Sequence, residues 1–266
     1  MEGGNGMSGI LVTGASGRMA AAIRPRLSDL FDEVVLYSRS SIGELEPHER
    51  LVLGDLSDGD RVREAAQGMH AVLHLGGKAD EAPFEEILQA NLVGTYNVFD
   101  ASRRAGVRRV VYASSHHVTG FHSTDVAVDE TSPVRPDTLY GASKVFGEAL
   151  GRLHADKWGL EVVCLRIGVC RQRPENADQL RTWLSVPDSI ALVEAALTAD
   201  LPERYSVVYG VSDNARRFWS TRSAQALGYR PQDSADAFAA EFPTREFSSP
   251  YQGGRFCEPG YAGGTW

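Results

Sequence analysis

The chain has 266 residues, with 27 Lys plus Arg against 35 Asp plus Glu, so its formal net charge is −8. Hydrophobic residues make up 42% of the chain and charged residues 23%, a globular composition that excludes wholesale disorder. The acidic balance, without a block of basic residues, argues against nucleic acids and anionic membranes as partners.

The cysteines and the apolar runs indicate the cellular compartment. Cys164, Cys170 and Cys257 are odd in number and form no Cys-x-x-Cys pair, which argues against a disulfide framework and a zinc site. Free thiols are typical of a reducing compartment. The N-terminal residues show no signal-peptide pattern, and no apolar run approaches the length of a membrane span. We therefore expect a cytoplasmic protein.

Apolar runs alternate with helical patterns along the chain. Strands are expected at residues 9–13, 33–37, 50–53, 71–75, 109–113, 161–165 and 205–209. Helices are expected at residues 18–27, 60–67, 83–105, 140–158 and 182–199. Pro25 and Pro187 should kink or interrupt two of these helices, and Gly106 and Gly159 should end two others. Apolar strands that alternate with helices predict a parallel sheet covered on both faces.

A glycine-rich turn follows the first strand. Gly14-x-x-Gly17-x-x-Ala20 joins that strand to the first helix. Gly14 permits the tight turn, Gly17 permits the close approach of a pyrophosphate, and Ala20 permits close packing of the helix on the sheet. The N–H groups at the helix N-terminus then bind the phosphates. The position of the motif at the first strand–helix junction disfavours the alternative, a glycine turn with a packing role only.

The alternating strands and helices, together with this motif, predict the fold class and the domains. We expect an α/β protein with a Rossmann-type doubly wound parallel sheet and a small C-terminal substrate-binding region packed on it. We expect residues 9–170 to form the NAD(P)-binding Rossmann domain and residues 171–266 to form the small substrate-binding region. Residues 1–8 are expected to be a flexible tail. Residues 247–266, which are rich in Gly, Pro and aromatic residues, are expected to be irregular.

The residues after the second strand indicate which nicotinamide cofactor binds. The acidic residue that usually holds the adenosine ribose is absent there: the chain has Ser38, Arg39 and Ser40, and no acid before Glu44. Arginine suits a 2′-phosphate, so we expect NADP to be favoured, with NAD still able to bind. The alternative is an exposed surface arginine. Asp55, after the third strand, is a candidate partner of the adenine amino group, or alternatively a helix N-cap.

A Tyr-x-x-x-Lys pair begins the helix expected at 140–158. Tyr140 and Lys144 are four residues apart, so both side chains leave the same face of the helix. A nearby ammonium group favours the phenolate and lowers the pKa of Tyr140 towards that of a useful base. Ser115, at the mouth of the fifth strand, is expected to hydrogen-bond the reacting oxygen. An isolated pair of this kind is more often a solvated helix face, but this pair follows a phosphate turn and a strand that ends in two serines.

These motifs resemble the extended short-chain dehydrogenase/reductase superfamily, of the NAD-dependent epimerase/dehydratase type. The superfamily resemblance is carried by Gly14-x-x-Gly17, Asp55, Asn91, Ser115 and Tyr140-x-x-x-Lys144. The uronate dehydrogenases are the branch to which the chain is most similar. The segments that carry this similarity are His74-Leu-Gly-Gly77, Ala113-Ser-Ser-x-His117, Arg166-Ile-Gly168, Thr182-Trp183 and Gln252-Gly-Gly254.

The resemblance implies an oxidoreductase that oxidises the C1 hemiacetal of a hexuronate or related sugar to a lactone, with hydride transfer to a nicotinamide. Tyr140 would take the hydroxyl proton, Lys144 would support it, and Ser115 would orient the sugar oxygen. The residues implied to bind the cofactor are Gly14, Ser16, Gly17, Arg18, Met19, Ser38, Arg39, Asp55, Leu56, Leu75, Gly76, Gly77, Asn91, Tyr140, Lys144 and Ile167. The residues implied to contact the substrate are Lys78, Ala79, Ser115, His116, His117 and Asp178.

The substrate-binding positions depart from the uronate dehydrogenases. Lys78-Ala79 stands where those enzymes have a substrate-binding serine, and His116 stands in place of an asparagine. Asp178 replaces the arginine that clamps the substrate carboxylate, and an aspartate there would repel a carboxylate. A neutral or amino sugar, or another small hydroxy compound, therefore stays open as the substrate. The cations that would replace the clamp are Lys78, Arg171, Arg173 and Arg181.

Two other functions also stay open. One is a nucleotide-sugar epimerase/dehydratase-like enzyme, which needs a larger C-terminal lobe; the other is a non-catalytic NADP-sensing protein, which need not keep Ser115, Tyr140 and Lys144. His116 and His117 have no cysteine or acidic partner at ligand spacing, so no metal site is expected. The expected partner is a small molecule, a sugar, and a homo-oligomer is left open because relatives are often oligomers.

Overall fold

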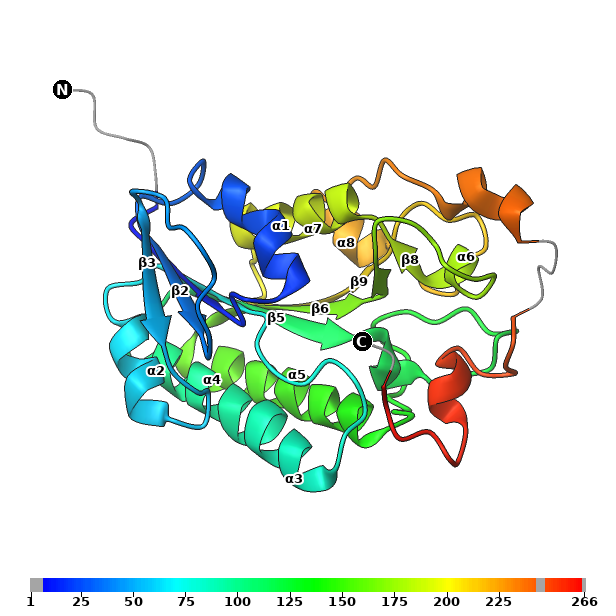
Figure 1. Ribbon diagram of the computed structural model, residues 1–266, viewed down its shortest axis with the longest axis horizontal. Helices are drawn as coiled ribbons and strands as arrows, with labels where there is room; N and C mark the ends of the chain where they lie inside the picture. The colour runs from blue at the N-terminus through cyan, green and yellow to red at the C-terminus, as the bar shows by residue number, and fades with distance from the viewer. Residues whose placement is uncertain (1–6, 243–246, 265–266) are drawn as a thin grey trace.

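Seven strands form one parallel sheet in the order β3-β2-β1-β4-β5-β6-β9 (Figure 1). The computed structural model describes residues 7–242 and 247–264. The strands of this sheet are β1 (Ile10–Thr13), β2 (Val34–Ser38), β3 (Glu49–Leu53), β4 (Ala71–His74), β5 (Arg109–Ser115), β6 (Glu161–Ile167) and β9 (Tyr205–Gly210). The order reverses between β1 and β4, as in a doubly wound Rossmann sheet, so the predicted fold class is confirmed.

Helices cover both faces of the sheet. In Figure 1, α1 (Arg18–Leu27), α7 (Val186–Thr198) and α8 (Arg222–Ala226) lie on one face, whereas α2 (Gly59–Ala66), α4 (Gly94–Arg104) and α5 (Leu139–Trp158) lie on the other. Short elements complete the chain: α3 (Phe84–Ile87), α6 (Gln179–Thr182), β7 (Val169–Cys170), β8 (Trp183–Leu184), and the helical turns η1 (Leu88–Val93), η2 (His116–Thr119), η3 (Ala235–Glu241) and η4 (Gly254–Cys257).

The core consists of two apolar layers separated by the sheet. Successive strand residues point to opposite faces. Ile10 and Val12 of β1 therefore pack with Ile23 of α1 in one layer. Leu11 packs with Phe99 of α4 in the other layer. Because both faces are buried, strands such as β1 and β2 carry continuous apolar runs rather than alternating ones, whereas the edge strand β3 is partly exposed.

The helix expected at 83–105 forms as three consecutive segments. α3 is followed by the π-helical η1 and then by α4, and Gly106, with φ of +70°, ends the run as predicted. A π-helical turn fits one extra residue into the helix and is often found at functional sites. Asn91 lies in η1 and is buried.

The prediction of a helix at residues 182–199 is wrong for its first residues. Trp183–Leu184 is the short strand β8, which pairs with β7, and α7 begins only at Val186. Pro187 therefore lies in the first turn of α7, where its missing N–H costs no hydrogen bond, and does not interrupt a helix. The Ser185 hydroxyl caps this helix by accepting from the Asp188 N–H at 3.0 Å. Pro25 lies inside α1, which ends two residues later at Leu27.

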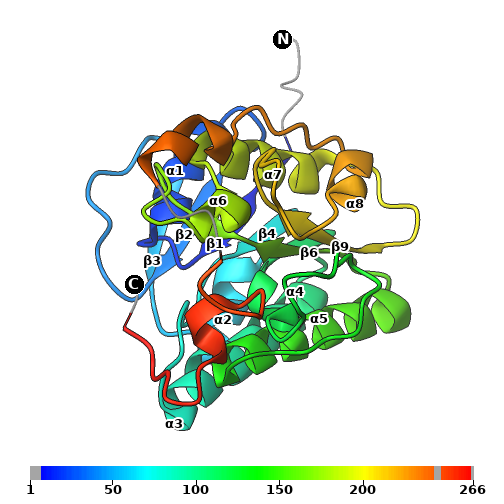
Figure 2. The same ribbon diagram turned by 90° about the vertical axis from the view of Figure 1, so that its right-hand side faces the viewer.

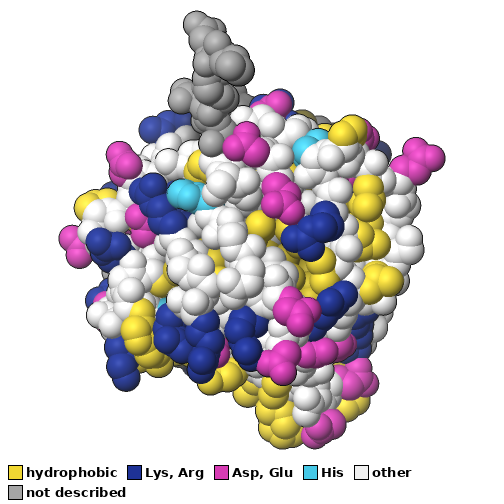
Figure 3. Space-filling model, turned by 90° about the vertical axis from the view of Figure 1, so that its left-hand side faces the viewer, with side chains coloured by type: hydrophobic (Ala, Val, Ile, Leu, Met, Phe, Trp, Pro, Cys, Tyr) yellow, Lys and Arg dark blue, Asp and Glu magenta, His cyan; other side chains and the backbone are white. Residues whose placement is uncertain are grey.

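The two ends of the chain are described in part. Residues 1–6 of the expected tail, and residues 265–266, lie outside the described residues. Met7 is held, because its N–H donates to Leu30 O at 3.0 Å and its carbonyl accepts from the Asp32 N–H at 3.0 Å. Among the described residues, no helix combines the length and apolarity that crossing a membrane requires. Figure 3 shows basic and acidic side chains interspersed on one face of the molecule.

Candidate active site

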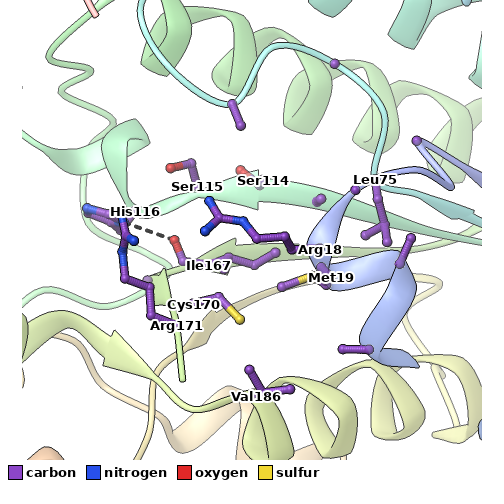
Figure 4. Close-up of a pocket in the computed structure, with 18 of the residues that line it drawn as sticks. Arg18, Met19, Leu75, Ser114, Ser115, His116, Ile167, Cys170, Arg171 and Val186 are labelled. Carbon is purple, nitrogen blue, oxygen red and sulfur yellow. Dashed lines mark hydrogen bonds between the residues drawn. The ribbon is translucent and has the colours of Figure 1, made fainter. Parts of the chain in front are cut away.

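A cavity opens at the carboxyl ends of the parallel strands. It has a volume of about 720 Å³ and is lined by the turn after β1, the segment after β4, the ends of β5 and β6, and the start of α5 (Figure 4). A smaller cavity of about 250 Å³ continues towards the ends of β2 and β3. Ligands of open α/β sheets bind at this edge, where the strand order reverses.

The turn after β1 brings two backbone segments into direct contact. Gly14 has φ of +70°, and a Cβ atom there would lie 2.7 Å from both Cα and N of Gly76. Glycine is therefore required at this position. Gly17 is the N-cap of α1 and lines both cavities, so the first turn of the helix faces them. A close backbone and an open helix N-terminus fit the pyrophosphate of a dinucleotide.

Of the residues predicted to bind the cofactor, all but Asn91 line one of the two cavities. The Asn91 side chain instead holds the backbone of Lys78: its Oδ1 accepts from the Lys78 N–H at 2.7 Å, and its Nδ2 donates to Lys78 O at 3.1 Å. Nδ2 also donates to the Ser143 hydroxyl at 2.9 Å. Asn91 therefore fixes the segment after β4 from behind the cavity wall.

The residues predicted to contact the adenosine of the cofactor line the smaller cavity. Ser38, Arg39 and Asp55 line it. Asp55 Oδ1 accepts from the N–H of Ser57 at 2.9 Å and from its hydroxyl at 2.8 Å, and these bonds hold the pKa of Asp55 below its usual value. The N-cap of α2 is Asp58, so the alternative of Asp55 as a helix cap is wrong.

Ser115, Tyr140 and Lys144 line the same cavity and are buried. Thr138 caps α5 by accepting from the Gly141 N–H at 2.9 Å, so that the helix begins one residue before Tyr140. Lys144 Nζ donates to Ala113 O at 2.8 Å and lies 5.6 Å from the centre of the Tyr140 ring. The spacing of four residues thus brings phenol and ammonium together beside the end of β5.

Burial sets the charge states of this pair. It raises the pKa of Tyr140 to about 12, and the Ser115 hydroxyl opposes this rise. Burial also lowers the pKa of Lys144 to about 8. The pKa of Tyr140 is thus raised by burial, whereas the sequence predicted that it would be lowered, so Tyr140 is a neutral phenol at neutral pH in this state. Additional positive charge in the cavity would favour its phenolate.

The two histidines of η2 have different partners. His116 Nδ1 lies 3.0 Å from Ile167 O, and burial lowers the pKa of His116 well below its usual value. The ring is therefore neutral, with Nδ1 carrying the proton that it donates to the carbonyl. His117 Nδ1 lies 2.6 Å from Asp137 Oδ2, and its ring is stacked on Phe256 with 3.8 Å between centroids.

Glu81 and Asp137 are among the acidic residues near Tyr140 that were not predicted from the sequence. Glu81 Oε2 accepts from the Tyr140 N–H at 2.8 Å, and Asp137 binds His117. Asp137 lies directly before the helix cap Thr138, a position that could have marked it. No local pattern indicates Glu81, because 59 residues separate it from its partner.

The predicted substrate residues do not all reach the cavity. Lys78, Ala79, Ser115, His116 and His117 line it. Asp178 is not among the described residues that line either cavity. Its Oδ1 accepts from the N–H of Ser248 at 2.8 Å, and its Oδ2 accepts from the Ser248 hydroxyl.

Arginines line the cavity near the predicted substrate residues. Arg171 and Arg173 belong to the lining, and Arg171 Nη1 lies 2.8 Å from Glu175 Oε1. Figure 4 shows Arg171 extending towards His116, and Arg18 entering from the start of α1. Of the other cations considered as clamps, Lys78 lines the cavity and pairs with Glu86. Arg181 instead donates to Arg216 O at 3.4 Å.

Comparison with known proteins identifies the family to which the chain belongs. Residues 10–170 match the NAD dependent epimerase/dehydratase family. The chain is 40% identical to uronate dehydrogenase of Pseudomonas syringae pv. tomato over 94% of each chain. It is 36% identical to NAD-dependent glucose-6-phosphate dehydrogenase of Haloferax volcanii, over 87% of this chain and 96% of that one. A mutant uronate dehydrogenase from Agrobacterium tumefaciens in complex with NAD superimposes with a TM-score of 0.89 at 37% identity, covering 95% of this chain and 97% of that chain.

Proposed function

Because the chain belongs to the NAD dependent epimerase/dehydratase family and is a nicotinamide-dependent dehydrogenase, we propose that it oxidises the C1 hemiacetal of a hexuronate or related sugar to a lactone. The observation that carries this proposal is the meeting of Ser115, Tyr140 and Lys144 in one cavity with the glycine turn after β1. The bound nicotinamide supplies the acceptor for the C1 hydride.

The side chains of the cavity have distinct roles in this proposal. Tyr140, as phenolate, takes the proton of the C1 hydroxyl, and Ser115 holds the same oxygen by a hydrogen bond. Lys144 stabilises the phenolate with its ammonium group, which Ala113 O orients at 2.8 Å. The residues implied to bind the cofactor keep this role in our proposal, with Asn91 acting through the backbone of Lys78.

NADP is the preferred cofactor in this proposal, although NAD also binds. Arg39 and Ser38 line the smaller cavity, where a 2′-phosphate on the adenosine ribose would lie. Arg39 offers a charge-assisted, bidentate contact to such a phosphate. Two of the relatives named above, the glucose-6-phosphate dehydrogenase and the Agrobacterium tumefaciens enzyme, act with NAD or bind it.

In this proposal, the substrate group that distinguishes a hexuronate from a neutral or amino sugar lies near Lys78, His116 and Arg171. The Asp178 carboxylate is hydrogen-bonded to Ser248. An anionic group of the substrate would therefore be bound by a cation that lines the cavity. Arg171 is the favoured candidate, because its backbone is fixed: its N–H donates to Leu184 O at 3.2 Å, and its carbonyl accepts from Trp183 Nε1 at 2.9 Å.

One assay matrix tests the proposed function. Purified protein is mixed with NAD or NADP and a panel of hexuronates, neutral aldoses and amino sugars, and reduced nicotinamide is followed by absorbance. Turnover that Tyr140→Phe abolishes is the expected result. Turnover of uronates that Arg171→Met removes identifies the replacement clamp, whereas turnover of neutral sugars alone identifies an altered pocket. Cofactor binding without turnover of any compound would overturn the proposal.

Location, domains and assembly complete the proposal. The protein acts in the cytoplasm, as its three free cysteines favour, with residues 9–170 binding cofactor and residues 171–266 binding substrate. It forms a homo-oligomer, supported by exposed apolar side chains spaced seven residues apart on α5: Leu139, Phe146 and Leu153. Light scattering of the wild type and of Phe146→Glu tests this assembly, because a monomeric wild type would contradict it.

A further inference from the structure

The C-terminal residues pack against segments that line the larger cavity or lie beside it. Residues 251–264, named here the C-terminal strap, run past the start of α5 towards the segment after β4 (Figures 1 and 2). The strap is anchored at its beginning, where the Gln252 N–H donates to His122 O and the Gly253 N–H donates to Gly120 O, both at 2.9 Å. The strap then places Phe256 against His117.

The far end of the strap is bonded to a carboxylate beside the cavity. Tyr261 Oη donates to Asp80 Oδ1 at 2.5 Å, and the Gly264 N–H donates to Asp80 Oδ2 at 3.0 Å. A Cβ atom at Gly263 would lie 2.1 Å from Glu81 O, so the two backbones are in direct contact there. Asp80 and Glu81 directly follow Lys78 and Ala79, which line the cavity.

These contacts continue to the proposed catalytic tyrosine. The Glu81 N–H donates to Asp80 Oδ1 at 2.8 Å, and Glu81 Oε2 accepts from the Tyr140 N–H at 2.8 Å. Phe256 and Tyr140 belong to one buried apolar cluster, against which Tyr261 packs. The strap therefore reaches Tyr140 both through hydrogen bonds and through ring packing.

We propose that the C-terminal strap, through the Tyr261–Asp80 hydrogen bond, positions residues 78–82 and Tyr140 for the reaction. Tyr261 is a positioning residue, since it is not among the described residues that line either cavity. This inference rests on the proposed function, because it assigns the strap a part in the same reaction. It predicts that losing one hydroxyl at the end of the chain loosens the wall of the cavity.

Asp80 also affects the base by its charge. The negative charges of Asp137 and Asp80 raise the pKa of Tyr140. The ionisable groups that face Tyr140 are Lys144 on α5, Asp137 before it, His117 on η2, and Asp80 and Glu81 after β4. Removing the charge of Asp80 lowers the pKa of Tyr140. The acid limb of the kcat/KM profile then moves to lower pH, because Tyr140 acts in its deprotonated form.

The test compares Tyr261→Phe with Tyr251→Phe. Tyr261→Phe keeps the ring, 4.3 Å from Phe256 between centroids, and removes only the donor to Asp80. Tyr251→Phe is a matched control, because this residue begins the same strap, is exposed, and packs on Phe121 rather than on the cavity wall. Hydrogen exchange of the full chain is followed by mass spectrometry for peptides covering residues 78–82 and 139–143, alongside steady-state kinetics.

In Tyr261→Phe we expect faster exchange in both peptides and kcat/KM for the sugar about tenfold lower, the effect of one hydrogen bond to a charged group. A higher KM for the sugar should carry most of this loss. Tyr251→Phe should match the wild type in both measurements. In Asp80→Asn, the acid limb of the pH profile should move to lower pH.

Unchanged exchange in Tyr261→Phe, or equal effects of the two tyrosine variants, would overturn the role of the strap. An acid limb of Asp80→Asn that stays in place or moves to higher pH would overturn the link from Asp80 to Tyr140. If the wild type oxidises no sugar, the proposed function fails, but the exchange measurement still decides whether the strap holds the cavity wall.

Discussion

Replacing Lys144 by Met would test whether the ammonium group sustains the phenolate of Tyr140. Lys144 Nζ lies 5.6 Å from the centre of the Tyr140 ring, and both groups are buried. If the phenolate charge is placed at the ring centre, an effective dielectric constant of about 20 gives an interaction of about 3 kcal/mol, or about two pH units. Because the positive charge favours the phenolate, its loss raises the pKa of Tyr140.

The assay is kcat/KM for the best sugar as a function of pH. In Lys144→Met the acid limb should move to higher pH by about two units, and activity at pH 7 should fall about a hundredfold. Lys144→Arg, which keeps the charge, should move the limb less. Lys157→Met, at the far end of α5, serves as the control. A loss of the same factor at every pH would refute the electrostatic argument and leave only a role in binding.

Other substitutions test the rest of the site. Arg39→Asp should reverse the ratio of kcat/KM for NADP to that for NAD in favour of NAD by at least about tenfold, and an unchanged ratio would contradict the proposed 2′-phosphate contact. Glu148→Gln should lower the free energy of unfolding by about 3 kcal/mol in a denaturant titration, because Arg166 would keep a buried charge without its carboxylate. Gly14→Ala should abolish cofactor binding in a fluorescence titration, whereas Gly68→Ala, with φ of +75° but open space around it, should not; similar losses would point to backbone strain instead of the clash.

The sheet and the glycine turn could be predicted because their signals are local. Each strand is a short apolar run, and Gly14 begins a turn that glycine alone permits. Tyr140 and Lys144 were found for the same reason, since one helical turn relates them. The strand β8 was missed because Trp183 and Leu184 are compatible with a helix, and only pairing with β7 makes them extended.

The partners of the site residues could not be predicted in the same way. Glu81 reaches Tyr140, and Tyr261 reaches Asp80, across many intervening residues. Asp178 is a different case: the resemblance implied a substrate contact, whereas its carboxylate accepts hydrogen bonds from Ser248. Such contacts depend on how loops pack, and loop packing leaves no periodic pattern in the sequence.

The hydrogen bonds of Asn91 affect how the substrate specificity of this cavity can change. Its amide meets the N–H and the carbonyl of residue 78 as a neighbouring strand would, so it recognises the backbone and not the side chain. The course of the chain at Lys78 is therefore secured independently of which side chain projects into the cavity. Substitutions at residue 78 can alter the chemistry of the cavity wall while the wall itself stays in place. A scaffold built in this way can acquire a new sugar specificity by single substitutions, without rebuilding the loop that carries them.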